Sequence, residues 1–306
     1  MPLELRLATR GSALARWQTH HVATRLGIAT REIVIETRGD VDQSPILAGK
    51  LEKGFFTEEL ERALRANEVD VAVHSLKDLP TAQPKGLCLG AILQRADPRD
   101  WLLINRDAVD TTRALPVREG ARVGASSLRR MALLRHHAPW ATAVPLRGNV
   151  PTRVSKLAAR ADYEAIILAA AGLRRLELDL SAFHVVALTP SVWIPAPGQG
   201  AIAVQCREDD TATLAALKVI DDAETRRQVE TERTLLRAFE GGCSSPFGAY
   251  LPSNSTTLHA GLERDGRWAL ATLNLPWNTP LTHEHANRRL ADLPLTETHA
   301  ALTENC

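Results

Sequence analysis

The sequence predicts an α/β protein of several domains, and three observations carry this prediction. Short apolar stretches of strand type alternate with helix-like stretches over the first two hundred residues. Ser12, which can cap a helix, and Thr57, which two glutamates follow, stand at the starts of such helical stretches. Near residue 211 the pattern changes to a long charged helix followed by a hairpin. Repeated β-α-β units imply parallel sheets covered by helices, and the changed pattern implies a separate small α+β domain.

Each expected element has a local reason. Ser12 caps a helix that runs to about residue 26, and Glu58 and Glu59 place negative charge at the positive end of the helix that follows Thr57. Asp265 and Gly266 form a turn between two strands. The expected strands are residues 3–8, 32–37, 69–73, 87–93, 101–104, 121–125, 165–168, 201–206, 258–263 and 268–273, the later helices are residues 127–135 and 223–239, and short helices are expected in the tail of residues 282–306.

Two stretches are typical of crossings between domains, namely residues 96–100, which contain a proline, and residues 190–200, which contain several Pro and Gly residues. Two adjacent crossings form a hinge, and a cleft is expected between the domains that they join. The expected boundaries are residues 1–95 with 196–218 for domain 1, residues 100–192 for domain 2 and residues 220–306 for domain 3.

The composition excludes several classes of protein. The 37 Lys and Arg residues nearly balance the 36 Asp and Glu residues, so no basic field indicates a nucleic-acid partner. No apolar run is long enough to cross a membrane, and the first residues do not resemble a signal peptide. The four cysteines show no zinc spacing, which predicts reduced thiols in the cytoplasm and no metal site.

Three segments at strand-to-helix junctions concentrate Arg, Ser, Thr and Gly. Each combines the free N–H groups of a helix start with guanidinium groups, and this chemistry binds carboxylate or phosphate. A single segment of this kind is more often a capped helix with a solvated Arg, but three at strand ends favour a ligand with several negative groups. No Walker loop or dinucleotide fingerprint is present, so carboxylates are favoured over nucleotides. The segments are residues 9–12, 124–130 and 146–153.

His74, Lys77 and Asp78 follow an apolar strand. Lys77 and Asp78 have two possible interpretations. They form a surface ion pair, or Lys77 is a cation for substrate anions and Asp78 is a carboxylate that stabilises a developing positive charge. His74 is either a general base or a hydrogen-bonded histidine at a strand end. Lys53 to Phe56 place two adjacent aromatic rings before a helix, and one of them is a candidate for a ligand-facing surface.

Cys243 follows two glycines directly. Base rates favour a buried structural thiol, since reactivity depends on a local pKa that the sequence does not give. The glycines nevertheless leave the approach to this thiol bare of side chains, and a thiol presented in this way also suits covalent attachment.

Taken in order, these motifs resemble the porphobilinogen deaminase (hydroxymethylbilane synthase) family. The resemblance covers nearly the whole chain. Its motifs are Ala8-Thr9-Arg10-Gly11-Ser12, Thr37-Arg38-Gly39-Asp40, Lys53-Gly54-Phe55-Phe56, Val73-His74-Ser75-Leu76-Lys77-Asp78, Ser126-Ser127-Leu128-Arg129-Arg130, Leu146-Arg147-Gly148-Asn149, Ala170-Ala171-Gly172-Leu173, Pro197-Gly198-Gln199-Gly200 and Glu240-Gly241-Gly242-Cys243.

The resemblance implies a fold and an activity. The fold is two α/β domains of type II periplasmic-binding-protein kind around a cleft, with a small C-terminal α+β domain. The activity is the head-to-tail condensation of four porphobilinogen molecules into hydroxymethylbilane with loss of ammonia. It is primed by a dipyrromethane cofactor held through a thioether to Cys243. A cytoplasmic monomer is implied as well.

The resemblance also implies residue roles. Asp78 is the catalytic carboxylate, which holds the pyrrole N–H groups and stabilises the azafulvene cation left when the amine departs. The cofactor-binding residues are Cys243, Ser75, Lys77, Asp78, Ser127, Arg129, Arg130 and Arg147, and the substrate-binding residues are Arg10, Ser12, Phe56, Arg147, Arg153, Arg175 and Gln199.

Two other functions compete with this one. A non-catalytic protein that binds polycarboxylates in a cleft needs the arginines but has no use for Asp78 or a tether. A transferase with a free cofactor needs no Gly-Gly-Cys motif.

Overall fold

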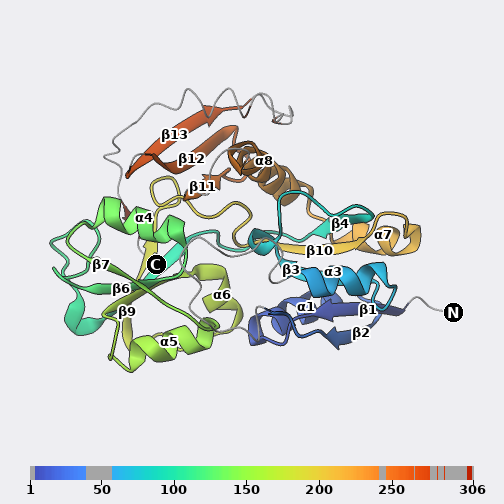
Figure 1. Ribbon diagram of the computed structural model, residues 1–306, viewed down its shortest axis with the longest axis horizontal. Coiled ribbons are helices and arrows are strands. Elements are labelled where there is room, and N and C mark those ends of the chain that lie inside the picture. The colour runs from blue at the N-terminus through green and yellow to red at the C-terminus, as the bar shows by residue number, and fades with distance from the viewer. Residues whose placement is uncertain are drawn as a thin grey trace. The chain divides into compact units, whose positions relative to one another are not determined.

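The computed structural model describes residues 4–38, 57–240, 246–264, 266–275, 281, 286 and 302–304 (Figure 1). The chain divides into two compact units, of which the first contains Met1–Ala96 and Gly200–Val229 and the second contains Asp97–Gln199 and Glu230–Cys306. The chain passes between the units at three points. Two of them, after Ala96 and after Gln199, fall within the stretches that the sequence marks as crossings, whereas the third, after Val229, was not predicted. The second unit also contains the C-terminal sheet, and the boundaries of a separate third domain stay a prediction.

The sheet of the first unit has five strands in the order β2-β1-β3-β10-β4. Strands β1, β2 and β3 are parallel, whereas β10 runs antiparallel to both β3 and β4. The sheet is therefore mixed and not purely parallel as the sequence predicted, because β10 enters it on the return from the second unit. The elements of this unit are β1 Glu4–Thr9, α1 Ala13–Leu26, β2 Ala29–Val34, α3 Glu58–Arg65, β3 Val71–Ser75, η1 Leu76–Asp78, β4 Leu87–Ile92, β10 Ile202–Arg207, α7 Thr211–Leu217, η3 Lys218–Ile220 and the start of α8 Ala223–Glu240.

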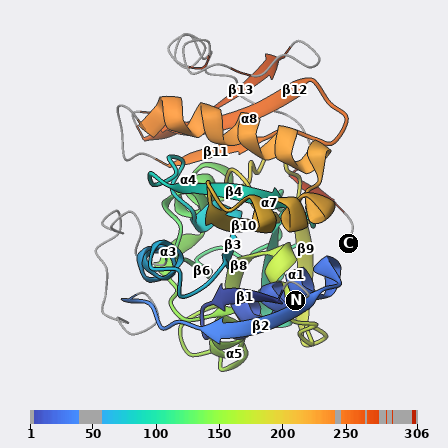
Figure 2. The same ribbon diagram turned by 90° about the vertical axis from the view of Figure 1, so that its right-hand side faces the viewer.

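Helices cover both faces of this sheet (Figure 2). Leu7 of β1 packs in one cluster with Val22 of α1 and Leu217 of α7, while the next residue, Ala8, packs in another cluster with Leu60 of α3. This alternation follows from the two-residue period of a strand. Ser12 caps α1 as predicted, because its hydroxyl accepts a hydrogen bond from the backbone N–H of Ala15 at 3.3 Å.

The sheet of the second unit has six strands in the order β14-β9-β5-β8-β6-β7. Strands β6, β7 and β8 are parallel, and β5 runs antiparallel to β8 and β9. Apart from β14, this order repeats that of the first sheet, with β5 in the place of β10. The elements are β5 Asp100–Asn105, η2 Arg106–Ala108, β6 Arg122–Ala125, α4 Leu128–His137, β7 Thr142–Pro145, α5 Val150–Ala158, β8 Ala165–Ala169, α6 Ala170–Arg175, β9 Phe183–Leu188 and β14 Thr303–Glu304.

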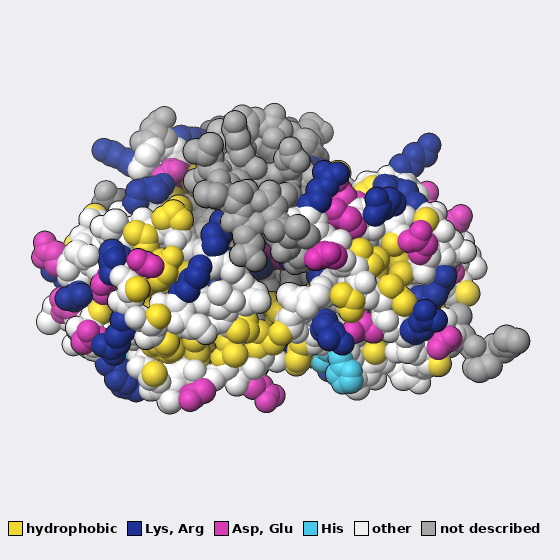
Figure 3. Space-filling view, turned by 60° about the horizontal axis from the view of Figure 1, so that its bottom comes forward, with side chains coloured by type: hydrophobic (Ala, Val, Ile, Leu, Met, Phe, Trp, Pro, Cys, Tyr) yellow, Lys and Arg dark blue, Asp and Glu magenta, His cyan; other side chains and the backbone are white. Residues whose placement is uncertain are grey.

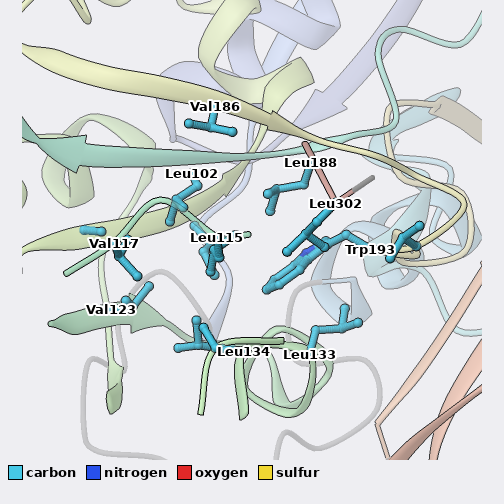
Figure 4. Close-up of a cluster of buried hydrophobic side chains, with 14 of the residues drawn as sticks. Leu102, Leu115, Val117, Val123, Leu133, Leu134, Val186, Leu188, Trp193 and Leu302 are labelled. Carbon is cyan, nitrogen blue, oxygen red and sulfur yellow. The ribbon is translucent and has the colours of Figure 1, made fainter. Parts of the chain in front are cut away.

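The core of the second unit lies between α4 and one face of its sheet. Figure 4 shows Trp193 among Leu133 of α4, Leu188 of β9 and Leu302, and all four side chains are nearly inaccessible to solvent. The opposite face packs against α5 and α6, with Leu157 and other apolar side chains in a separate cluster. The indole N–H of Trp193 donates to the buried carboxylate of Asp100 at 3.1 Å.

A third sheet, in the order β11-β12-β13, is antiparallel throughout. Its strands are β11 Phe247–Tyr250, β12 Thr257–Arg264 and β13 Arg267–Asn274. The β12–β13 hairpin confirms the predicted pair of strands, although Asp265 of the predicted turn lies outside the described residues. The C-terminal half of α8 packs on this sheet through Leu235 and Ala238. In the tail, residues 303–304 form a strand where helix was expected, Ala286 is helical, and most other tail residues lie outside the description.

The fold class is therefore confirmed as α/β with two large mixed sheets and a small C-terminal sheet. On the face that Figure 3 displays, Lys and Arg side chains are interspersed with Asp and Glu side chains. Within the described part of the chain, no helix combines the length and the apolar character needed to span a membrane.

Candidate active site

In the first unit, the predicted site residues gather at the carboxyl ends of β1 and β3. These two strands are parallel neighbours, with Ala8 paired to Ala72, so the residues that follow them lie at the same edge of the sheet. Arg10 follows β1, and η1 follows β3. We call this group the first edge, and its members are Arg10, Ser12, Ser75, Lys77 and Asp78.

Asp78 lies on a short turn that is fixed by its neighbours. Leu76 and Leu79 are buried, and the backbone N–H of Leu76 donates to the carbonyl of Ala201 at 3.1 Å. Between these two anchors the side chains of Lys77 and Asp78 are exposed. The first edge therefore presents a carboxylate and an ammonium group on a positioned backbone, which suits electrostatic stabilisation of a charged reaction centre.

Ser75 and Ser12 are each held by a local contact. The hydroxyl of Ser75 contacts the buried amide of Gln18 on α1 at 2.9 Å, which ties the end of β3 to that helix. Ser12 already serves as the cap of α1. Both hydroxyl groups are therefore oriented by the fold, while their predicted roles in ligand binding stay predictions.

His74 is buried beneath the first edge and is 5% exposed. The pKa of His74 is lowered from 6.5 to about 4, mainly by burial and also by the nearby charge of Arg10, while a hydrogen bond with Gln205 opposes both effects. The imidazole is therefore neutral at pH 7 and lies in the sheet interior. This placement favours the structural interpretation of His74 over the general-base interpretation.

The depressed pKa of His74 predicts a specific sensitivity to acid. Between pH 6.5 and about 4 the unfolded chain takes up a proton that the folded protein does not, so the free energy of unfolding falls as the pH falls through this window. The loss reaches about 3 kcal/mol at the lower end. Denaturant titrations between pH 4 and pH 7 should show a flatter pH dependence for His74→Gln than for the unchanged protein.

His137 provides the matched comparison, because burial lowers its pKa to about 4 as well. His137→Gln should flatten the same pH window by a similar amount, independently of His74. Identical pH slopes for the unchanged protein and His74→Gln would contradict the assigned pKa of His74.

In the second unit, the predicted residues gather at the carboxyl ends of β6, β7 and β8. These strands are parallel and adjacent, so the starts of α4, α5 and α6 share one edge. The hydroxyl of Ser126 donates to the carbonyl of Leu146 and joins two of these junctions. We call this group the second edge, and its members are Ser127, Arg129, Arg130, Arg147, Arg153 and Arg175.

The turn between β7 and α5 is closed by its own contacts. Asn149 caps α5 through the backbone N–H of Thr152 at 3.0 Å, and the Nε of Arg153 donates to the carbonyl of Gly148 at 2.6 Å. Gly148 has a φ of 112°, a conformation that other residues rarely adopt. Pro151 lies in the first turn of α5, where proline is tolerated. The backbone around Arg147 is therefore well defined.

Arg129 and Arg130 are buried, with 4% and 6% of their surfaces exposed. Their outer nitrogens contact the two oxygens of Asp100, at 3.0 Å for Arg129 and 2.7 Å for Arg130. Each guanidinium also donates to a backbone carbonyl, from Arg129 to Ile194 at 2.8 Å and from Arg130 to Ile167 at 3.1 Å. The two arginines are therefore built into the second unit.

Asp100 is completely buried at the start of β5. Besides the two arginines, the amide of Gln199 donates to it at 2.8 Å and the indole N–H of Trp193 at 3.1 Å. Burial alone would raise the pKa of Asp100, but Arg130 and Arg129 hold it well below its usual range. Asp100 is therefore a carboxylate with four side-chain donors.

Sequence reasoning missed Asp100, since Asp97-Pro98-Arg99-Asp100 was interpreted as a crossing between domains. A usable signal was present, because two adjacent arginines at a strand end require a nearby negative charge when they are buried.

Arg175 is half-buried on α6, and burial lowers its pKa to about 10. Gln199, predicted to bind substrate, contacts Asp100 and the carbonyl of Pro98 at 2.7 Å.

The second edge fits a carboxylate-bearing cofactor. Among the described residues, the Nε–H donors of Arg129 and Arg130 are buried without a hydrogen-bond acceptor. Ser127 stands at the start of α4, and its side chain makes no capping hydrogen bond. Positively charged N–H donors and a helix start are suited to a carboxylate. A dipyrromethane carries several carboxylates, so these residues suit it.

Two of the predicted residues lie outside the described residues. Phe56 and Cys243 belong to segments 39–56 and 241–245, which the description does not include. Their roles stay predictions. The helix α8, which ends at Glu240 and leads toward Cys243, is part of the described fold.

The fold and the two edges define an α/β protein with cations suited to carboxylates at its strand ends and one exposed carboxylate on a fixed turn. Residues 5–215 match the family described as "Porphobilinogen deaminase, dipyromethane cofactor binding domain", and residues 226–262 match "Porphobilinogen deaminase, C-terminal domain". The chain belongs to the porphobilinogen deaminase family.

Similar proteins carry the same name. The chain is 44% identical over 297 residues to porphobilinogen deaminase of Xanthomonas campestris pv. campestris (strain B100), with 94% of each chain covered. It is 42% identical over 302 residues to porphobilinogen deaminase of Stenotrophomonas maltophilia (strain K279a), with 96% of each covered. Among solved structures, a double mutant of the VFT2 domain of Bordetella pertussis BvgS is 15% identical with a TM-score of 0.42, covering 71% of this chain and 86% of that one.

Proposed function

We propose that this chain condenses four porphobilinogen molecules head to tail into hydroxymethylbilane and releases one ammonia for each. The observation that carries the proposal is the exposed Asp78 on its fixed turn, beside Lys77 and at the same edge as Arg10. A protein that only binds polycarboxylates gains nothing from a carboxylate among its cations. A reaction that passes through a cationic pyrrole requires one.

Asp78 supplies the negative charge in this proposal. As the amine leaves porphobilinogen, positive charge develops on the pyrrole, and a fixed carboxylate stabilises that charge more than it stabilises the neutral substrate. The same carboxylate accepts a hydrogen bond from the pyrrole N–H. Leu76 and Leu79 keep its backbone in place, so little reorganisation is needed during the reaction.

The cationic and hydroxyl side chains bind the acetate and propionate groups. Arginine is suited to this task because its planar group matches a carboxylate with two parallel hydrogen bonds. Ser75, Lys77, Ser127, Arg129, Arg130 and Arg147 are assigned to the cofactor, and Arg10, Ser12, Phe56, Arg147, Arg153, Arg175 and Gln199 are assigned to the substrate. When bound, the dipyrromethane supplies the primer to which new rings are joined, and Cys243 is its proposed attachment point.

The proposal includes a monomer in the cytoplasm. Its support is the spread of four cysteines without disulfide or metal spacing, and a surface on which both charge signs are mixed. The three-domain division, with a cleft between the first two domains, also belongs to the proposal.

The test is a stoichiometric assay of the purified protein with porphobilinogen. Four ammonia molecules should appear for each linear tetrapyrrole, and no added cofactor should be needed. Binding of porphobilinogen without release of ammonia would instead support the polycarboxylate-binding protein. An Asp209→Asn variant is the matched control, since Asp209 is an exposed carboxylate outside both edges and its loss should leave the stoichiometry unchanged.

A further inference from the structure

The charges around Asp100 do not balance. Among the residues that the structure describes, two buried guanidinium groups, those of Arg129 and Arg130, face one buried carboxylate, so this part of the cluster keeps one positive charge in excess. The other contacts of Asp100, from Gln199 and Trp193, are uncharged donors. A buried excess charge is unfavourable unless a partner of opposite sign is supplied, so the cluster is complete only with one further anion.

The hydrogen bonds of Arg129 and Arg130 are also incomplete. Asp100 and two backbone carbonyls accept hydrogen bonds from the outer nitrogens of the two arginines. The Nε–H of each arginine is left buried without an acceptor among the residues that the structure describes. A carboxylate carries the charge that would balance this excess, and its oxygens accept hydrogen bonds from N–H donors of this kind.

We propose that Asp100 is a positioning residue for the cofactor. Asp100 fixes Arg129 and Arg130 so that their Nε–H donors and one positive charge remain for a carboxylate of the dipyrromethane. The inference rests on the proposed function. Asp100 itself does not touch the ligand, and acts only through the two arginines. Its own position is set by Trp193, which is part of the unit's apolar core, and by Gln199.

Asp97, three residues earlier, provides a contrast. It also pairs with two arginines, Arg99 at 2.8 Å and Arg174 at 3.4 Å, and its side chain is 6% exposed. However, Arg174 is itself exposed and is not among the residues assigned to the cofactor. Asp97 is therefore a carboxylate with a comparable ion-pairing environment and no expected part in binding.

The test compares Asp100→Asn with Asp97→Asn. The folded monomer of each variant is isolated by size exclusion, and its intact mass gives the fraction that carries the covalent dipyrromethane. Loading should fall about tenfold in Asp100→Asn, as is typical when a residue that orients ligand-binding groups is removed. Asp97→Asn should be loaded like the unchanged protein, even where its thermal stability is lower.

Equal loading of Asp100→Asn and the unchanged protein would overturn the positioning role. An equal loss of loading in both variants would overturn it as well, because the loss would then follow stability. If Asp100→Asn does not fold, Trp193→Phe serves in its place, because it removes one hydrogen bond to Asp100 without changing the charge. Trp193→Phe should reduce cofactor loading at unchanged expression. Full loading of this variant would overturn the inference. Failure of the proposed function is distinguishable, because the unchanged protein would then carry no dipyrromethane and release no ammonia.

Discussion

Replacement of Asp78 by Asn should leave the fold and the covalent cofactor intact and lower turnover by at least about a hundredfold. The amide has the shape of the carboxylate, but it carries no charge to stabilise the cation that forms when ammonia departs. Asp78 is exposed between two buried leucines, so the substitution removes no core contact. The rate of tetrapyrrole formation at saturating porphobilinogen measures the effect.

Intact mass is the control for this experiment, because it shows that the variant still carries its dipyrromethane. Asp209→Asn removes a carboxylate from an exposed position of the same unit and should keep normal turnover. Turnover within a few-fold of the unchanged protein in Asp78→Asn would remove Asp78 from the catalytic role.

The active protein should be heavier than its sequence by one dipyrromethane, and Cys243→Ser should remove that additional mass and the activity together. A thiolate forms readily near neutral pH and is the nucleophilic form of cysteine, whereas a serine hydroxyl stays protonated and forms no comparable bond. Peptide mapping of the unchanged protein places the adduct on one residue. The expected residue is Cys243.

Cys206 offers a matched comparison for the tether. It is completely buried, and burial raises its pKa to about 12, so its thiol is an inert structural group. Cys206→Ala should therefore keep the adduct. A bare mass for freshly purified active protein, or an adduct on another cysteine, would contradict the assignment of Cys243.

The sequence predicts the fold well where periodicity and caps agree. The helix after Ser12 and the β12–β13 hairpin are confirmed nearly residue for residue. The strand expected at residues 32–37 instead occupies Ala29–Val34, because half-exposed edge strands have weak apolar patterning. Strands β7 and β9 were not predicted. β7 is a strand of only four residues, whereas β9 contains the apolar run Val185-Val186-Ala187-Leu188, which was not assigned to a strand.

The sequence did not predict the direction in which every strand runs. Alternating strands and helices predict parallel pairing, but β10 and β5 each run antiparallel within otherwise parallel neighbours. The reason is that each enters its sheet directly after a passage between the units, without a helix to reverse the chain. The sequence shows no internal repeat, yet the two sheets share one strand order, which only the hydrogen bonds reveal.

The sequence predicted which cationic and hydroxyl residues gather at the two edges, but it did not predict the residue that pairs with Arg129 and Arg130. Arg129 and Arg130 stand in a recognisable motif at a strand end, whereas Asp100 lies in a polar stretch that is typical of a linker. Its pairing with the arginines joins segments about thirty residues apart, and no local pattern encodes a contact of that kind.

The place of β10 between β3 and β4 sets the order in which the molecule can be made. During translation β3 and β4 are synthesised before β5 to β9. The strand that joins β3 to β4 is β10, which ends at Arg207 and is synthesised after β5 to β9. Until then both strands expose open edges. The turn that carries Asp78 is also completed late, because the backbone N–H of Leu76 donates a hydrogen bond to the carbonyl of Ala201. The first edge, which carries Asp78, is therefore completed only after the main strands of the second unit have been synthesised.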